Sequence, residues 1–410
     1  MKFNIVTLGC KVNTYESNFM KESLINNGFS FSEEINDCDI IIINTCTVTD
    51  TSDKKSLKMV RRYRKENPNA IMVVCGCSTQ NNASLYENID IQIVLGNKDK
   101  SKIVDLINEY LKNKEKIVNV TKERNLPFED MEITSFNQVR AYIKVQDGCN
   151  NFCSYCVIPF VRGHLRSKSF KKVLCECENL VKNGYKEIVL TGIHTGSYND
   201  EGKDLCDLIN AISEIEGIQR IRLSSVEITE LNDKFMELLK TNKVFCNHLH
   251  VPLQSGCDEI LKIMNRKYDT KYYENKINEI RSVIPDISIT TDVIVGHNYE
   301  TEELFEKTYE FCKKINFAKI HVFPYSKRTG TASSKMEGEV KEEIKKQRAR
   351  KLIELSNLLE QEYYDSFKGK MVDVLIEKVN NGQSIGHTSN YLNVTLNEAL
   401  EVNKIYQRII

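Results

Sequence analysis

The chain has 410 residues, 41% of them hydrophobic, so it is long enough for two or three domains with proper cores and is not disordered. Lysine and arginine together number 57, as do aspartate and glutamate together, so the chain has no overall positive charge to attract nucleic acid. Any nucleic-acid surface must therefore be a local patch. Fourteen cysteines in a long chain, without a signal peptide or an apolar run that could span a membrane, exclude a secreted disulfide scaffold and favour metal binding in the cytoplasm.

Short apolar runs alternate with helical stretches over roughly the first 112 residues. This alternation predicts an open parallel α/β sheet domain, with strands at 3–7, 39–44, 71–74 and 91–95. Cys10, Cys46 and the pair Cys75 and Cys77 each lie just past one of the first three strands, at the edge where parallel sheets bind ligands. One such cysteine is more often a buried apolar side chain, but three at equivalent strand ends favour a shared site.

A polar stretch from 112 to 137 contains Pro127 and an acidic cluster at 129–132. Its composition is typical of a linker. We therefore expect a first domain over residues 1–125 and a second over 135–366.

Three cysteines fall within eight residues after the linker: Cys149, Cys153 and Cys156. A structural zinc site needs four closed ligands, whereas three thiolates on a cubane iron–sulfur cluster leave one iron open for chemistry. We expect Tyr155, just before the last cysteine, to lie against a planar ligand at that iron. The alternative interpretation is a zinc knuckle or a group of buried free thiols.

Six strand-like runs follow the linker and predict an incomplete (β/α)6 barrel of the TIM type, at 139–145, 187–190, 220–224, 248–251, 287–295 and 319–323. The cysteine loop follows the first of them, at the rim where barrel enzymes place their active sites. Gly192, Ser224 and Glu227 follow the second and third strands and are candidate cofactor contacts. Turn and surface roles are the more ordinary interpretation of such residues. After a long helix at 340–367, short strands predict a small all-β domain over 367–410 that captures substrate.

The cysteine loop resembles the signature of the radical S-adenosylmethionine superfamily, Cys-x-x-x-Cys-x-aromatic-Cys. Several further strings resemble the radical methylthiotransferases, most closely the branch that modifies threonylcarbamoyladenosine in tRNA. They span the chain, at 7–13, 44–49, 76–80, 190–198, 220–225 and 250–256.

The resemblance implies two 4Fe-4S clusters, one held by Cys149, Cys153 and Cys156 and an auxiliary one held by Cys10, Cys46 and Cys77. Cys75 departs from the family pattern and competes with Cys77, which we favour because Gly76 precedes it. A second departure is the turn His297-Asn298-Tyr299, where the family has a glycine in place of Tyr299. If that position requires a positive φ, Tyr299 strains the turn.

The activity implied by the resemblance is insertion of a methylthio group at C2 of N6-threonylcarbamoyladenosine at position 37 of tRNA. A radical made from S-adenosylmethionine removes the hydrogen, and a second S-adenosylmethionine has methylated the sulfur delivered from the auxiliary cluster. An electron donor such as flavodoxin or ferredoxin is required, and the chemistry belongs to the clusters while the protein orients the reactants.

The expected nucleic-acid partner is the tRNA anticodon loop rather than DNA. Arg162 and Arg166 follow the cluster loop and match a family string, so we expect them to contact the RNA backbone. The tail resembles the RNA-binding TRAM domain and is expected to end slightly short of it, with Tyr391 stacking on a base or filling a strand core. The basic run 341–351 is either a phosphate-binding patch or a solvated helix face.

Three alternatives stay open. A methylthiotransferase acting on a ribosomal protein, or on isopentenyladenosine in tRNA, would share the same architecture. A non-enzymatic, metal-dependent RNA-binding protein would use its cysteines for structure alone.

Overall fold

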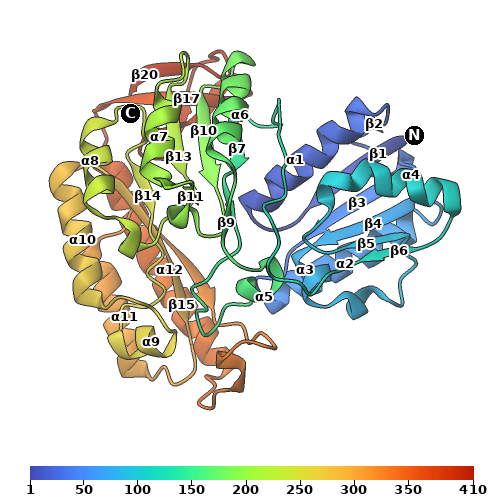
Figure 1. Ribbon diagram of the computed structural model, residues 1–410. Coiled ribbons are helices and arrows are strands. Elements are labelled where there is room, and N and C mark those ends of the chain that lie inside the picture. Colours follow the sequence, from blue (N-terminus) through green and yellow to red (C-terminus); the bar gives the residue numbers. More distant parts are fainter.

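Three units follow one another along the chain in the computed structural model, which describes residues 1–410 (Figure 1). An N-terminal sheet domain lies beside a partial barrel, and a small C-terminal sheet covers one end of that barrel. No helix is long and apolar enough to cross a bilayer. The predicted fold class is confirmed in each of its three parts.

The N-terminal unit is a six-stranded, all-parallel sheet in the order β2-β1-β3-β4-β5-β6. Every residue of the central strand β3 is buried, as expected for a parallel strand covered on both faces. Helices α1 and α4 pack on one face and α2 on the other. The strands are β1 (Lys2–Thr7), β2 (Ser30–Phe31), β3 (Ile40–Thr45), β4 (Ile71–Gly76), β5 (Ile93–Leu95) and β6 (Ile117–Asn119), and the helices are α1 (Lys11–Asn26), η1 (Ile35–Asp37), α2 (Asp50–Glu66), α3 (Cys77–Asn81), η2 (Ala83–Tyr86), η3 (Lys100–Lys102) and α4 (Ile103–Asn113).

Six parallel strands form the partial barrel, as two sheets in the orders β13-β10-β7 and β14-β15-β16. A parallel bridge between Ile221 and Phe245 joins the two sheets. The strands are β7 (Arg140–Lys144), β10 (Glu187–Thr191), β13 (Arg220–Leu223), β14 (His248–His250), β15 (Ser288–Val295) and β16 (Lys319–Pro324), with short pairs β8 (Gln146–Asp147) with β9 (Arg166–Ser167) and β11 (Asn199–Asp200) with β12 (Lys203–Asp204) at the rim.

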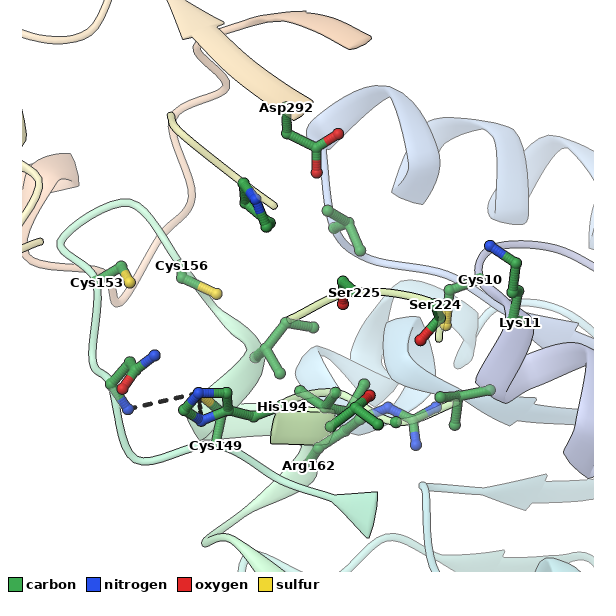
Figure 2. Close-up of a pocket in the computed structure, with 18 of the residues that line it drawn as sticks. Cys10, Lys11, Cys149, Cys153, Cys156, Arg162, His194, Ser224, Ser225 and Asp292 are labelled. Atoms are coloured by element: carbon green, nitrogen blue, oxygen red, sulfur yellow. Dashed lines mark hydrogen bonds between the residues drawn. The ribbon is translucent and has the colours of Figure 1, made fainter. Parts of the chain in front are cut away.

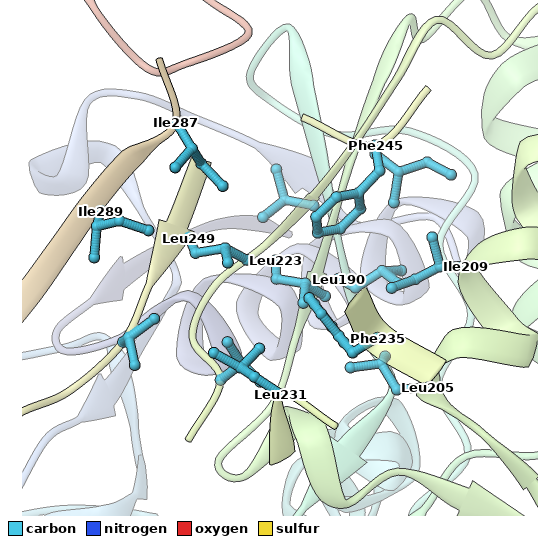
Figure 3. Close-up of a cluster of buried hydrophobic side chains, with 14 of the residues drawn as sticks. Leu190, Leu205, Ile209, Leu223, Leu231, Phe235, Phe245, Leu249, Ile287 and Ile289 are labelled. Atoms are coloured by element: carbon cyan, nitrogen blue, oxygen red, sulfur yellow. The ribbon is translucent and has the colours of Figure 1, made fainter. Parts of the chain in front are cut away.

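Helices surround these strands and complete the main core. Leu190, Leu223 and Leu249 point from consecutive barrel strands toward the helix layer, where they meet Leu205 and Phe235 (Figure 3). Because side chains alternate along a strand, the neighbours of these leucines point into the barrel lumen. The helices of this unit are α5 (Ile158–Arg162), α6 (Phe170–Lys182), η4 (Thr195–Ser197), α7 (Leu205–Ser213), η5 (Ile228–Glu230), α8 (Asp233–Thr241), α9 (Asp258–Ile263), α10 (Thr270–Val283), α11 (Glu302–Ile315) and η6 (Ser333–Lys335).

The chain ends in a four-stranded antiparallel sheet, which follows the long helix α12 (Glu342–Asp365). This sheet covers the end of the barrel where the strands begin: Arg140 pairs with Glu377 at 2.5 Å, and Arg220 donates to the Asp373 carbonyl. The cysteine loop lies at the opposite end, after β7 has ended. The sheet has the order β19-β18-β17-β20, with β17 (Met371–Asn380), β18 (Gln383–Thr388), β19 (Asn393–Leu396) and β20 (Ile405–Ile409).

Candidate active site

One large cavity of about 650 Å³ opens where the N-terminal sheet meets the barrel rim (Figure 2). Six of the fourteen cysteines line it, and they are the six that the family resemblance implied as ligands of two clusters: Cys10, Cys46, Cys77, Cys149, Cys153 and Cys156. Cys75 is fully buried and packs in the sheet core with Phe3 and Leu24. The geometry therefore places Cys77, and not Cys75, at the cavity.

A glycine with positive φ precedes three of these cysteines. The φ angles of Gly9, Gly76 and Gly148 are 108°, 107° and 72°. A β-carbon on Gly76 would stand 2.5 Å from the Thr45 carbonyl oxygen, and one on Gly148 would collide with the His164 carbonyl. Only glycine permits these turns, so each Gly-Cys pair turns the chain out of its strand and exposes the thiol to the cavity.

Cationic side chains lie against the Cys149–Cys156 loop. Arg266 donates to Cys153 Sγ at 3.3 Å and pairs with Glu227, while His194 Nδ1 lies 3.9 Å from Cys149 Sγ. Burial lowers the pKa of His194, but its hydrogen bonds to Cys149 and Glu230 raise it to about 10. Positive charge beside a sulfur favours the thiolate that a metal requires.

Cys156 in one trio and Cys46 in the other are poor acids without a metal. Burial is the main cause that raises the pKa of Cys156 to about 12 and that of Cys46 to about 11. Neighbouring thiolates add to the effect in each trio, since Cys153 and Cys149 raise the pKa of Cys156, and Cys77 and Cys10 raise that of Cys46. Cys156 and Cys46 therefore need a bound cation to become thiolates at neutral pH.

The donor set fits clusters better than single ions. No three Cys, His, Asp or Glu side chains gather closely enough to hold one metal ion. Thiols that surround a cavity instead suit a multi-iron cluster, which each thiolate binds through a different iron.

Groups suited to a polar cofactor lie next to the cysteine loop. Ser224 Oγ is buried at the cavity wall without a hydrogen-bond partner. A β-carbon on Gly192 would stand 3.0 Å from Gln146, whose Oε1 accepts the N–H groups of Ile193 and His194. Tyr155 lines the same cavity and meets His297 edge-on at 6.3 Å. The four residues predicted to bind cofactor, Tyr155, Gly192, Ser224 and Glu227, thus all face one space.

A buried ionic network joins the two trios, and sequence reasoning missed it. Glu16 on α1 accepts from Arg162 at 3.0 Å and from Lys144 at 3.1 Å, and it also pairs with Lys100. Arg162 also contacts Asp147 at 3.1 Å. Burial opposes the charge of Glu16, yet Arg162, Lys100 and Lys144 hold its pKa well below the usual value. The network links α1, which begins just after Cys10, to the segment that leads into Cys149.

The two arginines predicted to contact RNA, Arg162 and Arg166, both belong to this buried ionic network. Arg162 is 2% exposed and also donates to Asn13 at 2.7 Å, so its guanidinium faces protein rather than solvent. Arg166 pairs with Asp147 at 3.1 Å and donates to the Arg162 carbonyl. Burial turns Arg162 toward Glu16 and Asn13 of the N-terminal domain and away from RNA, whereas RNA contact by the half-buried Arg166 stays a prediction.

Of the two roles expected for Tyr391, its contacts favour packing over stacking on a base. Its ring lies between His248 and His387, with distances of 4.8 and 4.9 Å between ring centroids. Its hydroxyl accepts a hydrogen bond from Arg140 at 3.2 Å. Tyr391 therefore closes the barrel end opposite the cysteines instead of offering a face to RNA. In the basic helix run, Lys345 and Arg348 are buried and pair with Glu342 and Glu300, whereas Lys346 and Arg350 stay exposed on a solvated face.

The turn His297-Asn298-Tyr299 meets the condition of its prediction, because Tyr299 adopts a positive φ. Tyr299 has a φ of 65°, in the left-handed region that favours glycine. Its ring packs over Gly338, whose added β-carbon would clash with it, and its N–H donates to the Gly338 carbonyl at 2.8 Å. These contacts stabilise the turn outside the cavity.

Comparisons with known proteins match nearly the whole chain. The family model of the radical SAM superfamily matches residues 143–312, and that of the uncharacterized protein family UPF0004 matches residues 2–96. The threonylcarbamoyladenosine tRNA methylthiotransferase MtaB of Bacillus subtilis (strain 168) is 39% identical over 95% of this chain and 88% of its own. The tRNA-2-methylthio-N(6)-dimethylallyladenosine synthase of Acetivibrio thermocellus is 36% identical over 91% of this chain and 80% of its own.

A solved structure supports the fold. The radical S-adenosylmethionine methyltransferase TsrM from Kitasatospora setae has a TM-score of 0.58 at 14% identity, covering 78% of this chain and 72% of that one. At this identity the likeness concerns architecture alone.

Proposed function

The chain belongs to the radical S-adenosylmethionine methylthiotransferase family, and on that premise we propose that it inserts a methylthio group at C2 of N6-threonylcarbamoyladenosine in tRNA. The observation that carries the proposal is the single cavity lined by two separate cysteine trios. Two clusters facing one space would bring a radical source and a sulfur source to the same substrate atom.

Each trio has its own part in the proposal. Cys149, Cys153 and Cys156 hold the 4Fe-4S cluster that binds S-adenosylmethionine, and Cys10, Cys46 and Cys77 hold a second cluster. When bound, these groups supply one-electron cleavage of a carbon–sulfur bond and the methylthio group.

The protein's own residues bind, orient and exclude water. The Ser224 hydroxyl and the backbone beside Gly192 offer polar contacts to the cofactor, while Arg266 with Glu227 orients the cysteine loop through Cys153. The cavity volume of about 650 Å³ lies within the range typical of ligand sites, about 300–1,000 Å³. Since its walls come from two domains, their mutual orientation decides whether both clusters reach one substrate.

We also propose the limits of the three domains and the partners of the protein. The three units keep the limits 1–125, 135–366 and 367–410, which fall outside the regular elements that end at Asn119 and Asp365 and begin at Arg140 and Met371. The partners are the tRNA anticodon loop and an electron donor such as flavodoxin or ferredoxin.

Mass spectrometry of tRNA nucleosides from a deletion strain tests the proposal. Methylthiolated threonylcarbamoyladenosine should disappear, return with the wild-type gene and stay absent with Cys149→Ala. Loss of a methylthio group from dimethylallyladenosine or from a ribosomal protein instead would overturn it.

A second experiment tests the cofactors. Anaerobic reconstitution should give brown protein with about eight irons. Reductant and S-adenosylmethionine should then give 5′-deoxyadenosine. Colourless, zinc-loaded protein without turnover would favour a metal-dependent RNA-binding module.

A further inference from the structure

The barrel lumen beneath the active-site cavity is strongly basic. A second cavity of about 270 Å³ occupies this lumen and shares four lining residues with the larger one, which shows that the two adjoin: Lys11, Ser224, His250 and His321. Strand alternation explains why the histidines are there, since Leu249 points outward to the helices and its two neighbours point inward.

Most of the charge in this lumen is already compensated. Arg140 pairs with Glu377 at 2.5 Å, Arg222 with Glu187 at 2.7 Å, and Lys319 with Glu360 at 2.7 Å. His250 pairs with Asp292, the carboxylate on the same wall, at 3.3 Å. Lys11 is the exception, because it forms neither an ion pair nor a side-chain hydrogen bond, although it lines both cavities.

Lys11 enters the lumen from the other domain. It is the first residue of α1, directly after Cys10, and Figure 2 shows it on the side of the cavity away from the Cys149–Cys156 loop. Two imidazole rings of the surrounding wall also have unused hydrogen-bonding capacity. Nδ1 of His248, a residue only 5% exposed, has no hydrogen-bond partner, and the imidazole ring of His321 forms no hydrogen bond with the protein.

We propose that Lys11 binds a carboxylate on the N6 substituent of the substrate adenosine, and so selects an anionic substituent over an apolar one. This inference rests on the proposed function and specifies how the site recognises its substrate. The names of the relatives show why selection is needed, since a threonylcarbamoyl group carries a carboxylate whereas a dimethylallyl group is a neutral hydrocarbon.

The ammonium group of Lys11 would meet a different environment in the two complexes. A carboxylate would give the ammonium group a charge-assisted hydrogen bond in a confined space. A hydrocarbon would strip the same ammonium group of water and return no partner. An unpaired lysine in this position therefore favours the acid and disfavours the hydrocarbon.

A double-mutant cycle between protein and substrate tests the inference. We would measure the Kd of anticodon stem-loop RNA carrying threonylcarbamoyladenosine, and of the same RNA with a carboxamide in place of the carboxylate. Wild-type protein should prefer the acid by about tenfold or more. Lys11→Gln should lose that preference, and Lys11→Arg should restore much of it.

Lys319→Gln is the matched control, because Lys319 lines the same lumen but is already paired with Glu360. It should keep the preference of the wild type. Equal binding of acid and carboxamide by wild-type protein would overturn the inference even if Lys11→Gln fails to fold, and so would an undiminished preference in Lys11→Gln.

Methylthiolation by wild-type protein separates this failure from that of the proposed function. Product from dimethylallyl RNA and none from threonylcarbamoyl RNA would remove both proposals. Product from threonylcarbamoyl RNA, without any preference for its carboxylate, would remove only the role of Lys11.

Discussion

The two cysteine trios reach the same cavity by different routes. Cys149, Cys153 and Cys156 lie within one loop of eight residues, whereas Cys10, Cys46 and Cys77 come from three separate strand ends. The short spacing in the sequence is enough to bring the first trio together, and neighbouring side chains only adjust the geometry of the loop. The second trio comes together only when the parallel sheet has formed, so its geometry depends on the stability of the whole N-terminal unit.

The supports of the two trios differ accordingly. Arg266 and His194 contact the sulfurs of the loop directly. The scattered trio, Cys10, Cys46 and Cys77, depends on the sheet core. It also depends on the Glu16 network, which fixes the N-terminal domain against the barrel. Substitutions should therefore separate local damage to one trio from global damage to both.

The largest separation should come from the cysteines. Cys149→Ala should abolish 5′-deoxyadenosine formation, because the open iron is lost with its cluster. Cys77→Ala should retain it while losing methylthio transfer, since only the second cluster is removed. Iron content, 5′-deoxyadenosine and modified nucleoside, measured on each variant, check the outcome. Cys75→Ala is the control and should keep all three, whereas normal methylthio transfer by Cys77→Ala would contradict the assignment.

Glu16→Ala should disturb both trios at once. Removing this carboxylate leaves Arg162, Lys100 and Lys144 buried around an uncompensated site, and breaking such a network costs about 3–5 kcal/mol. Urea unfolding followed by circular dichroism measures the loss. Glu66→Ala, which removes an exposed pair with Arg62, should change the unfolding free energy by less than about 1 kcal/mol. Equal stabilities of the two variants would refute a structural role for the network.

Gly76→Ala should damage the scattered trio selectively. The new methyl group combines a strained φ of 107° with a contact 2.5 Å from the Thr45 carbonyl, and we expect a loss of about 1–3 kcal/mol. Iron should fall toward about four atoms, with 5′-deoxyadenosine formation retained. Gly184→Ala has a similar φ of 97° with nothing within 4 Å, so it isolates the cost of φ alone. Full iron content in Gly76→Ala would show that this turn does not position Cys77.

Tyr391→Phe should have the smallest effect and should leave both trios intact. It removes one hydrogen bond with Arg140 at the far end of the barrel, worth about 1 kcal/mol. Iron content and tRNA affinity should match the wild type. A selective loss of tRNA affinity at unchanged stability would show that the Tyr391 hydroxyl contacts RNA instead of serving Arg140 alone.

The elements were largely predictable because hydrophobic periodicity is a local property. Six barrel strands and four strands of the N-terminal sheet fall close to their expected ranges, while the edge strands β2 and β6, of two and three residues, were too short to be recognised. The proximity of Cys149, Cys153 and Cys156 was predictable for a similar reason, because they are neighbours in sequence.

The remaining features of the site depend on contacts between distant segments. Arg266 and Lys11 carry no local signal, since their importance comes from the sulfur or the cavity that the fold places beside them. Arg162 and Tyr391 carry misleading signals, because a cation and an aromatic ring suit a buried network as well as an RNA surface.

The sequence by itself determined which chemistry the chain can support, since the spacing of Cys149, Cys153 and Cys156 and the Gly-Cys turns are properties of short segments. Tertiary structure alone decided that Cys77 rather than Cys75 reaches the cavity, because β4 ends at Gly76 and leaves Cys75 inside the sheet core. It also decided how the two domains face each other, because buried charges must find their partners wherever the fold places them.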